Sequence, residues 1–197
     1  MYLAGMSELV GTAVTARLHI EVAAATGVGP TALAAFDDAL RVAGVYNFNL
    51  VRLSSVIPPG SFVSPATATA TAPSPVAEPS SVDVIDLRSD PEPASLSGAW
   101  GDRLYAVWAF ESAHVLGQEA WAGVAWVQDP ADGKGLFVEH EGGSESQVRE
   151  ELHASLTFIT RTRGLDHLPQ QQVVIGSKCE GEPVGSLVIA PYKTESW

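Results

Sequence analysis

The stretch "NFNLVRLSSVIPPG", residues 47–60, decides how the rest of the sequence is interpreted. It begins as a β-strand, because it is an apolar run bounded by turn residues and rich in β-formers. The prolines of Pro58-Pro59 cannot donate hydrogen bonds to a neighbouring strand, so we expect the strand to end near Ile57. The pair Ser54-Ser55 therefore falls in the last extended residues, directly before a rigid stop.

Length and composition indicate one packed domain. The chain has 197 residues, enough to bury one sizeable core, and we expect a single domain over 1–197. Hydrophobic residues make up 46% and charged residues 17%, which is typical of a globular protein. The formal charge of −12 argues against a nucleic-acid partner, because such partners require a basic surface.

No feature of the sequence indicates a membrane or a metal. No apolar run approaches the roughly 18 residues of a membrane span. The first residues lack the basic start and apolar core of a signal peptide, so we expect a cytoplasmic protein with no membrane partner. The single cysteine, Cys179, excludes an internal disulfide and a Cys-rich metal site. The five histidines do not have the spacing of zinc ligands, and we predict no metal site.

Residues 64–97 interrupt the chain with a segment rich in Pro, Ala, Ser and Thr. Such a composition buries little apolar area and favours extended, mobile backbone. We therefore expect an inserted flexible loop here, with one short strand at Val82–Leu87.

Periodic patterns on both sides of this insert predict strands and helices. Strands are expected at 12–26, 102–113, 119–129, 135–141, 171–180 and 185–192. Helices are expected at 30–44, which starts with Pro30, and at 144–164, where Ser144 begins a capping box and Gly164 closes the helix. The apolar stripe predicted for the first helix consists of Leu33, Phe36, Leu40 and Ala43. Six or seven strands with two helices on one face indicate an α/β layered fold.

The two serines allow an ordinary interpretation and a chemical one. The ordinary interpretation is that Ser54 and Ser55 are polar residues at a strand end. The chemical one is self-cleavage, in which a serine hydroxyl in a strained turn attacks the preceding carbonyl and converts the amide into an ester. Elimination then breaks the chain, and the serine becomes dehydroalanine and, after loss of ammonia, a pyruvoyl group.

Three stretches, including the one quoted above, resemble one known family. The helix "AFDDAL", the strand and stop "NFNLVRLSSVIPPG", and the strand end "VEHEGG" are similar to the pyruvoyl-dependent arginine decarboxylase family. The resemblance continues through the following helix to strands that end in "IAPYK", and covers most of the chain except 64–97. It implies a four-layer αββα sandwich of the pyruvoyl-dependent histidine and arginine decarboxylase type.

The resemblance also implies processing and assembly. Cleavage would fall between Ser54 and Ser55 and give a β chain of residues 1–54 and an α chain of residues 55–197. The α chain would begin with a covalent pyruvoyl cofactor made from Ser55. The subunits would form a homotrimer, or a dimer of trimers, with active sites between neighbours.

The implied activity is conversion of L-arginine to agmatine and carbon dioxide, in polyamine biosynthesis or arginine catabolism. The substrate amine would form an imine with the pyruvoyl group, which then acts as the electron sink that pyridoxal phosphate provides elsewhere. The chain has three lysines and no recognisable phosphate-binding loop, so an internal cofactor is the simpler expectation.

Glu139 is the expected proton donor, because it matches the first glutamate of the family's E-x-E-G motif. It shares a strand face with Phe137, and partial desolvation there favours the protonated carboxyl. An ordinary solvated glutamate is the alternative interpretation, and Glu141, on the same face, is the weaker rival. Asn49 matches the second asparagine of the strand motif and is expected to hold a carbonyl or the imine as an oxyanion-type donor.

Asp37 and Leu33 are the expected substrate-binding residues. On a helix Asp37 falls about 40° from Leu33, inside the predicted apolar stripe, whereas Asp38 points away. A carboxylate in that stripe needs a partner, and a substrate guanidinium would pair with it through two parallel hydrogen bonds. The helix alone equally allows an i,i+4 contact with Arg41.

Two other classes of function stay open at the level of sequence. One is a pyruvoyl decarboxylase acting on a different amino acid. The other is an unprocessed, non-catalytic homologue that serves as a structural or regulatory subunit with Ser54-Ser55 intact.

Overall fold

The computed structural model describes residues 18–66 and 96–197. It contains two helices, α1 (Ala32–Val42) and α2 (Glu145–Arg163). The strands are β1 (Leu18–Val28), β2 (Asn49–Arg52), β3 (Val56–Ile57), β4 (Ser61–Pro65), β5 (Arg103–Ala113), β6 (Glu119–Gln128), β7 (Gly135–Gly142), β8 (Gln170–Lys178) and β9 (Val184–Glu195). Within these residues neither helix is both long and apolar enough to cross a membrane.

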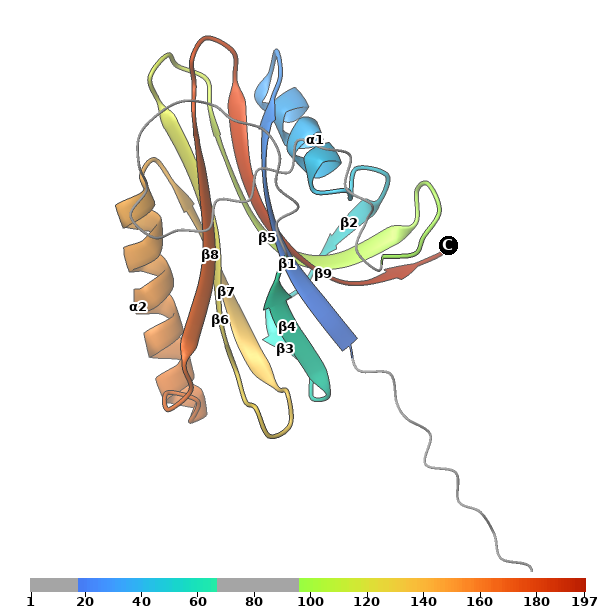
Figure 1. Ribbon diagram of the computed structural model, residues 1–197, viewed down its shortest axis with the longest axis vertical. Coiled ribbons are helices and arrows are strands. Elements are labelled where there is room, and N and C mark those ends of the chain that lie inside the picture. The colour runs from blue at the N-terminus through green and yellow to red at the C-terminus, as the bar shows by residue number, and fades with distance from the viewer. Residues whose placement is uncertain (1–17, 67–95) are drawn as a thin grey trace, which may run out of the picture.

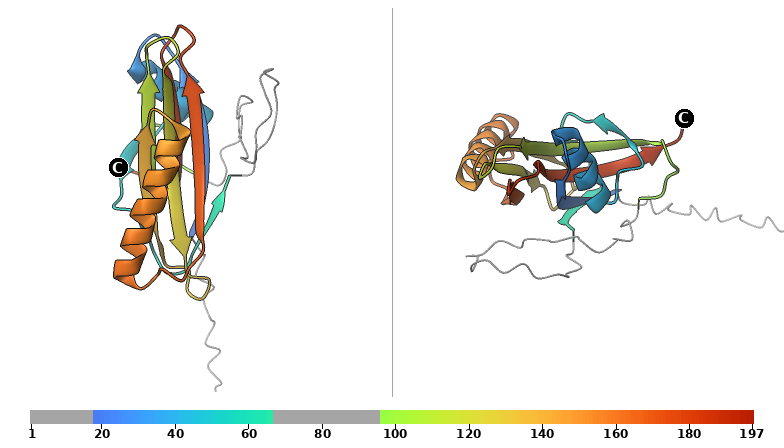
Figure 2. Two further views of the ribbon diagram at one scale, coloured as in Figure 1. Left: turned by 90° about the vertical axis from the view of Figure 1, so that its left-hand side faces the viewer. Right: turned by 90° about the horizontal axis from the view of Figure 1, so that it is seen from above.

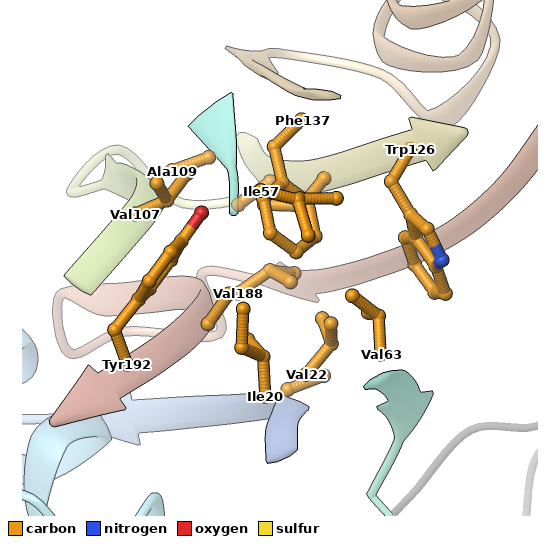
Figure 3. Packing of buried hydrophobic residues seen from close by; sticks show 14 of the residues in the cluster. Ile20, Val22, Ile57, Val63, Val107, Ala109, Trp126, Phe137, Val188 and Tyr192 are labelled. Carbon is orange, nitrogen blue, oxygen red and sulfur yellow. The ribbon is translucent and has the colours of Figure 1, made fainter. Parts of the chain in front are cut away.

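The strands form two sheets that pack face to face. The five-stranded sheet has the order β2-β5-β9-β1-β4, and the four-stranded sheet has the order β3-β7-β6-β8. Buried side chains from both sheets meet between them, including Ile20 and Val188 from one sheet and Trp126 and Phe137 from the other (Figure 3). This apolar layer is the main core, and it holds the two sheets together by removing apolar surface from water.

Each helix covers the outer face of one sheet, which completes a four-layer αββα sandwich (Figures 1 and 2). Helix α1 buries Ala39 and Leu40 against Leu187 and Ile189 of β9. Helix α2 buries Leu152 and other apolar residues against β6 and β8. The predicted fold class is therefore confirmed, but the expectation that both helices lie on one face is wrong. The helices follow strands of different sheets, so each covers the sheet beside it.

The helix boundaries follow the local signals in the sequence. The Thr31 side chain accepts a hydrogen bond from the Ala34 N–H and caps α1, and Ser144 caps α2 by accepting from the Gln147 N–H. Gly164 ends α2 in the left-handed conformation, at φ 68°. Helix α1 lies unusually close to β1, because a Cβ atom at Gly27 would be 2.2 Å from the Ala35 carbonyl oxygen.

The strand predicted to run from residue 47 to residue 57 is broken. Residues 49–52 form β2, which pairs in parallel with β5 in the five-stranded sheet. Residues 56–57 form β3, which pairs with β7 in the four-stranded sheet. The chain therefore leaves one sheet and enters the other at Leu53-Ser54-Ser55, and no single straight strand can do that.

The remaining predicted strands agree with the structure within a few residues. Strand β4 was not expected, and it extends to Pro65, inside the predicted insert 64–97. Residues 12–17 of the first predicted strand lie outside the described residues. So do Val82–Leu87 and most of the insert.

Candidate active site

Ser55 has the one non-glycine backbone with positive φ among residues 18–66 and 96–197, at φ 66°. A side chain in this left-handed region places Cβ too close to a carbonyl oxygen, which costs about 1–2 kcal/mol. The turn exists because β2 and β3 belong to different sheets and only Leu53, Ser54 and Ser55 connect them. The strain therefore falls on the second serine of the pair.

Two contacts from β7 hold Ser55 in this conformation. Its side-chain Oγ donates a hydrogen bond of 2.7 Å to Oε1 of Glu139. Its main-chain carbonyl accepts a hydrogen bond of 2.8 Å from the Phe137 N–H. The hydroxyl, the carbonyl and the carboxylate are thus fixed relative to one another by one strand.

Strand alternation places Glu139 at the rim of the core between the sheets. Phe137, two residues earlier on the same face, is buried in that core, whereas Val138 packs on the α2 side. Glu139 is half-buried and Glu141 is exposed, so the carboxylate nearer the core is the one that contacts Ser55.

Tyr192 approaches the same turn from the opposite sheet. Its hydroxyl donates a 3.1 Å hydrogen bond to the Val56 carbonyl, directly after Ser55. Burial raises the pKa of the Tyr192 hydroxyl above its usual range, and the negative charge of Glu139 raises this pKa further. Tyr192 is therefore a neutral donor close to the Glu139 carboxylate. The motif "IAPYK" contains this tyrosine, but nothing in its spacing predicts the contact.

Asn49 is not brought to Ser55 within the chain. It lies on β2, in the five-stranded sheet, and its side chain is exposed. Its Nδ2 donates to the carbonyl oxygen of Gly101, which also accepts from the Trp197 indole N–H. The Asn49 amide is thus held at the outer edge of this sheet.

The predicted apolar stripe of α1 is displaced around the helix. The buried residues are Ala35, Ala39, Leu40 and Val42. Leu33 is 76% exposed, and Asp37 is also exposed, so neither lies in the stripe. The closest approach to β1 is at Ala35 and Ala39, where a Cβ atom at Gly27 would be 2.2 Å from the Ala35 carbonyl oxygen and 2.3 Å from the Ala39 nitrogen. Figure 1 shows α1 and β3 at separate ends of the sheets.

Asp38, rather than Asp37, makes contacts with β1 and with Arg41. It accepts a hydrogen bond of 3.0 Å from the Val28 N–H and forms a 2.9 Å ion pair with Arg41. The prediction that Asp38 points away is therefore wrong, and Arg41 pairs with Asp38 rather than with Asp37. Asp37 remains available for a partner outside its own helix.

Comparison with known proteins identifies the family of this sandwich. The family model described as pyruvoyl-dependent arginine decarboxylase matches residues 19–72. Two relatives from strains of Halobacterium salinarum, each named pyruvoyl-dependent arginine decarboxylase, are 41% identical over 177 residues. That match covers 88% of this chain and 93% of each relative. The chain belongs to the pyruvoyl-dependent arginine decarboxylase family, as its motifs predicted.

A solved structure of pyruvoyl-dependent histidine decarboxylase at pH 8 is a more distant match. It is 19% identical to this chain, and the match covers 48% of this chain and 52% of that one, with a TM-score of 0.34. The assignment to the sandwich class therefore depends on the sheets and helices described above.

The left-handed backbone of Ser55 leads to a stability prediction. Glycine occupies this region without steric cost, so Ser55→Gly is expected to be about 1 kcal/mol more stable to unfolding than Ser55→Ala. Neither variant has a hydroxyl at position 55, so both are expected to remain single uncleaved chains and can be compared directly. Urea denaturation of the two variants measures the difference, and a more stable Ser55→Ala would show that the turn carries no strain.

Proposed function

We propose that this chain cleaves itself between Ser54 and Ser55 and then decarboxylates L-arginine to agmatine and carbon dioxide. It would act as a cytoplasmic homotrimer or dimer of trimers. The observation that carries the proposal is the Ser55 hydroxyl, which donates to Glu139 from a strained turn in a chain of this family.

Self-cleavage would proceed in balanced steps at this turn. The Ser55 Oγ forms a bond to the Ser54 carbonyl carbon, the amide C–N bond breaks, and the Oγ proton passes to the freed nitrogen. Removal of the Ser55 α-proton then breaks the Cβ–O bond and releases Ser54 as a carboxylate. The resulting dehydroalanine takes up water and loses ammonia to leave a pyruvoyl group. The left-handed backbone assists because it raises the free energy of the intact amide.

The two product chains are expected to stay together. Residues 1–54 contribute β1, α1 and β2, and residues 55–197 contribute the other elements. Strand β1 lies between β9 and β4 in the five-stranded sheet, and β2 pairs with β5. The fold therefore survives the cut, because strand pairing and the core hold the β chain in place.

The residues around Ser55 fit a pyruvoyl group at this position. Such a group supplies an electron sink for decarboxylation. The Phe137 N–H, which binds the Ser55 carbonyl in the intact chain, would hold that carbonyl after cleavage. Glu139, within 2.7 Å of the Ser55 Oγ, would hold the proton that replaces the departing carboxyl group.

Substrate recognition would require a neighbouring subunit. Asp37 and Leu33 are exposed on α1, and Asn49 is exposed on β2, whereas Ser55 and Glu139 meet at the start of β3. A cyclic trimer joins two different surfaces at each contact, so the α1 surface of one copy can meet the Ser55 turn of the next. Asp37 would then bind the arginine guanidinium, and Asn49 would hold a carbonyl near the reacting atoms.

Processing is the first test of this function. The purified protein should separate into chains of 54 and 143 residues, because 197 − 54 is 143. The larger chain should resist N-terminal sequencing, since a pyruvoyl group has no free amine. Ser55→Ala should stay one chain. Intact-mass spectrometry measures both, and a wild-type protein that keeps its full mass after long incubation would contradict the mechanism.

Glu139→Gln tests the proton donor. Glutamine keeps the size and the acceptor oxygen near Ser55 but cannot transfer the proton, so kcat of the fully processed variant should fall about 10²–10⁴-fold. Glu141→Gln is the matched control, because Glu141 lies on the same strand face but is exposed. Carbon dioxide release measures turnover. A processed Glu139→Gln variant with near wild-type kcat would move the role to Glu141 or to water.

Mixing two defective variants tests whether the site is shared. Ser55→Ala lacks the residue from which the cofactor is made. Asp37→Asn lacks the carboxylate proposed to bind arginine, and its free energy of arginine binding should weaken by about 2–5 kcal/mol. Reassembly of the two in equal amounts should restore about a quarter of wild-type activity, since one contact in four then joins an intact Ser55 to an intact Asp37. Each variant unfolded and refolded alone is the control, and mixtures as inactive as those controls would place Asp37 outside a shared site.

Arginine should be the best substrate in a panel that also contains lysine, ornithine and histidine. Lysine should be poor, because an ammonium cannot make the two parallel hydrogen bonds of a guanidinium. A different best substrate would assign the same pyruvoyl chemistry to another amino acid.

A further inference from the structure

The Ser55 turn is held from two sides, and the second side is Tyr192. Strand β3 is an edge strand that pairs only with β7 among the described residues. Carbonyls alternate along a strand, so the Ser55 carbonyl faces β7 while the Val56 carbonyl faces the unpaired edge. The Tyr192 hydroxyl supplies the missing donor at 3.1 Å.

The backbone of β9 is irregular where it presents this tyrosine. Tyr105 of β5 pairs with Lys193 and Ala106 pairs with Pro191, so Tyr192 is the extra residue of a β-bulge. Bulges change the direction of a side chain and occur often beside active sites. Figure 3 shows the Tyr192 ring in the core between the sheets, with its hydroxyl toward the β3 side near Ile57.

The ring of Tyr192 is fixed independently of its hydroxyl. The residue is 8% exposed, and its ring packs edge-on against Phe137, with centroids 6.2 Å apart. Phe137 is also the residue whose N–H binds the Ser55 carbonyl. A buried hydroxyl needs a partner, and the Val56 carbonyl is the partner that it has.

After cleavage, fewer contacts hold residue 55, so the hydrogen bond from Tyr192 to the Val56 carbonyl contributes more to its position. In the intact chain Ser55 is tethered on its N-terminal side by Ser54 and β2. After a cut between Ser54 and Ser55, that tether is lost and residue 55 begins a strand of two residues. Three contacts then hold the new chain start: the Phe137 N–H on the residue 55 carbonyl, the Tyr192 hydroxyl on the Val56 carbonyl, and the buried side chain of Ile57.

We propose that Tyr192 is a positioning residue for the chemistry at residue 55. By binding the Val56 carbonyl, its hydroxyl keeps the residue 55 carbonyl on the Phe137 N–H and keeps residue 55 beside Glu139. This inference depends on the proposed self-cleavage. It assigns Tyr192 two stages of action, alignment of the Ser55 hydroxyl before the cut and alignment of residue 55 after it.

Tyr192→Phe tests the proposal, because it keeps the buried ring and removes only the hydroxyl. Tyr105→Phe is the matched control. Tyr105 lies on β5, the neighbouring strand of the same sheet, and its hydroxyl donates to Glu195 at 2.6 Å rather than to the Ser55 turn. Each protein is made by cell-free translation, samples are quenched over time, and intact mass gives the rate of self-cleavage. Tyr192→Phe should cleave about three- to tenfold more slowly than wild type, and Tyr105→Phe should cleave at the wild-type rate.

Steady-state kinetics of the fully processed enzymes provides the second measurement. Tyr192→Phe should lower kcat for arginine by a similar factor and leave KM unchanged, since the hydroxyl acts through the Val56 carbonyl of the chain. Thermal unfolding of both tyrosine variants in the uncleavable Ser55→Ala background separates positioning from stability. In the Ser55→Ala background the two variants should have similar melting temperatures. In the chain that keeps Ser55, only Tyr192→Phe should cleave itself slowly.

The outcomes separate this proposal from the proposed function. If wild type cleaves itself and Tyr192→Phe matches it in both cleavage rate and kcat, Tyr192 does not position residue 55. The proposal would also be overturned if Tyr105→Phe and Tyr192→Phe were slowed equally. It would be overturned as well if only Tyr192→Phe were slowed but its melting temperature in the Ser55→Ala background fell below that of Tyr105→Phe. Self-cleavage would stand in both cases. A wild-type chain that never cleaves would overturn both.

Discussion

The passage of the chain from one sheet to the other at Leu53-Ser54-Ser55 is the constraint on which the candidate site depends. Strands β2 and β3 are separated by three residues but belong to different sheets of the sandwich. Ser55 adopts a left-handed backbone to make this passage. The strain is maintained because Phe137 and Glu139, both on β7, bind the carbonyl and the hydroxyl of the same residue. A turn without these partners would relax into ordinary extended backbone.

The core between the sheets gives this turn its rigidity. Ile57, immediately beyond the turn, is 1% exposed and packs with side chains of both sheets. Phe137 and Tyr192 approach from opposite sheets and contact each other edge-on. The same apolar layer that holds the sheets together therefore also positions the donors on the Ser55 and Val56 carbonyls.

The substrate-binding candidates Leu33 and Asp37 lie on the surface and not in the core. Helix α1 packs on β1 and β9 through Ala35, Ala39, Leu40 and Val42, whereas Leu33 and Asp37 lie on its exposed side. Exposed side chains do not line a pocket within one chain, but they can take part in a contact between two copies. The proposed site therefore has one part within a single chain, at Ser55 and Glu139, and a second part that we propose comes from a neighbouring copy.

Local structure and family membership can be inferred from short stretches of sequence. The caps at Thr31 and Ser144 and the turn at Gly164 involve groups within a few residues of one another. The strand periods are likewise properties of consecutive residues, and the serine pair before two prolines identifies the family from one short stretch. Such signals can be recognised without knowing which strands meet.

Contacts between residues far apart in the chain become visible only in the folded molecule. Glu139 is 84 residues from Ser55, and Tyr192 is 136 residues from Val56. The resemblance to the family indicated Glu139, but no pattern indicated Tyr192 or the break between β2 and β3. The sequence also misplaced Asp37 and assigned both helices to one face, because the buried side of a helix depends on how closely its neighbour approaches. These features arise from strand pairing and sheet packing, and local propensity carries no information about either.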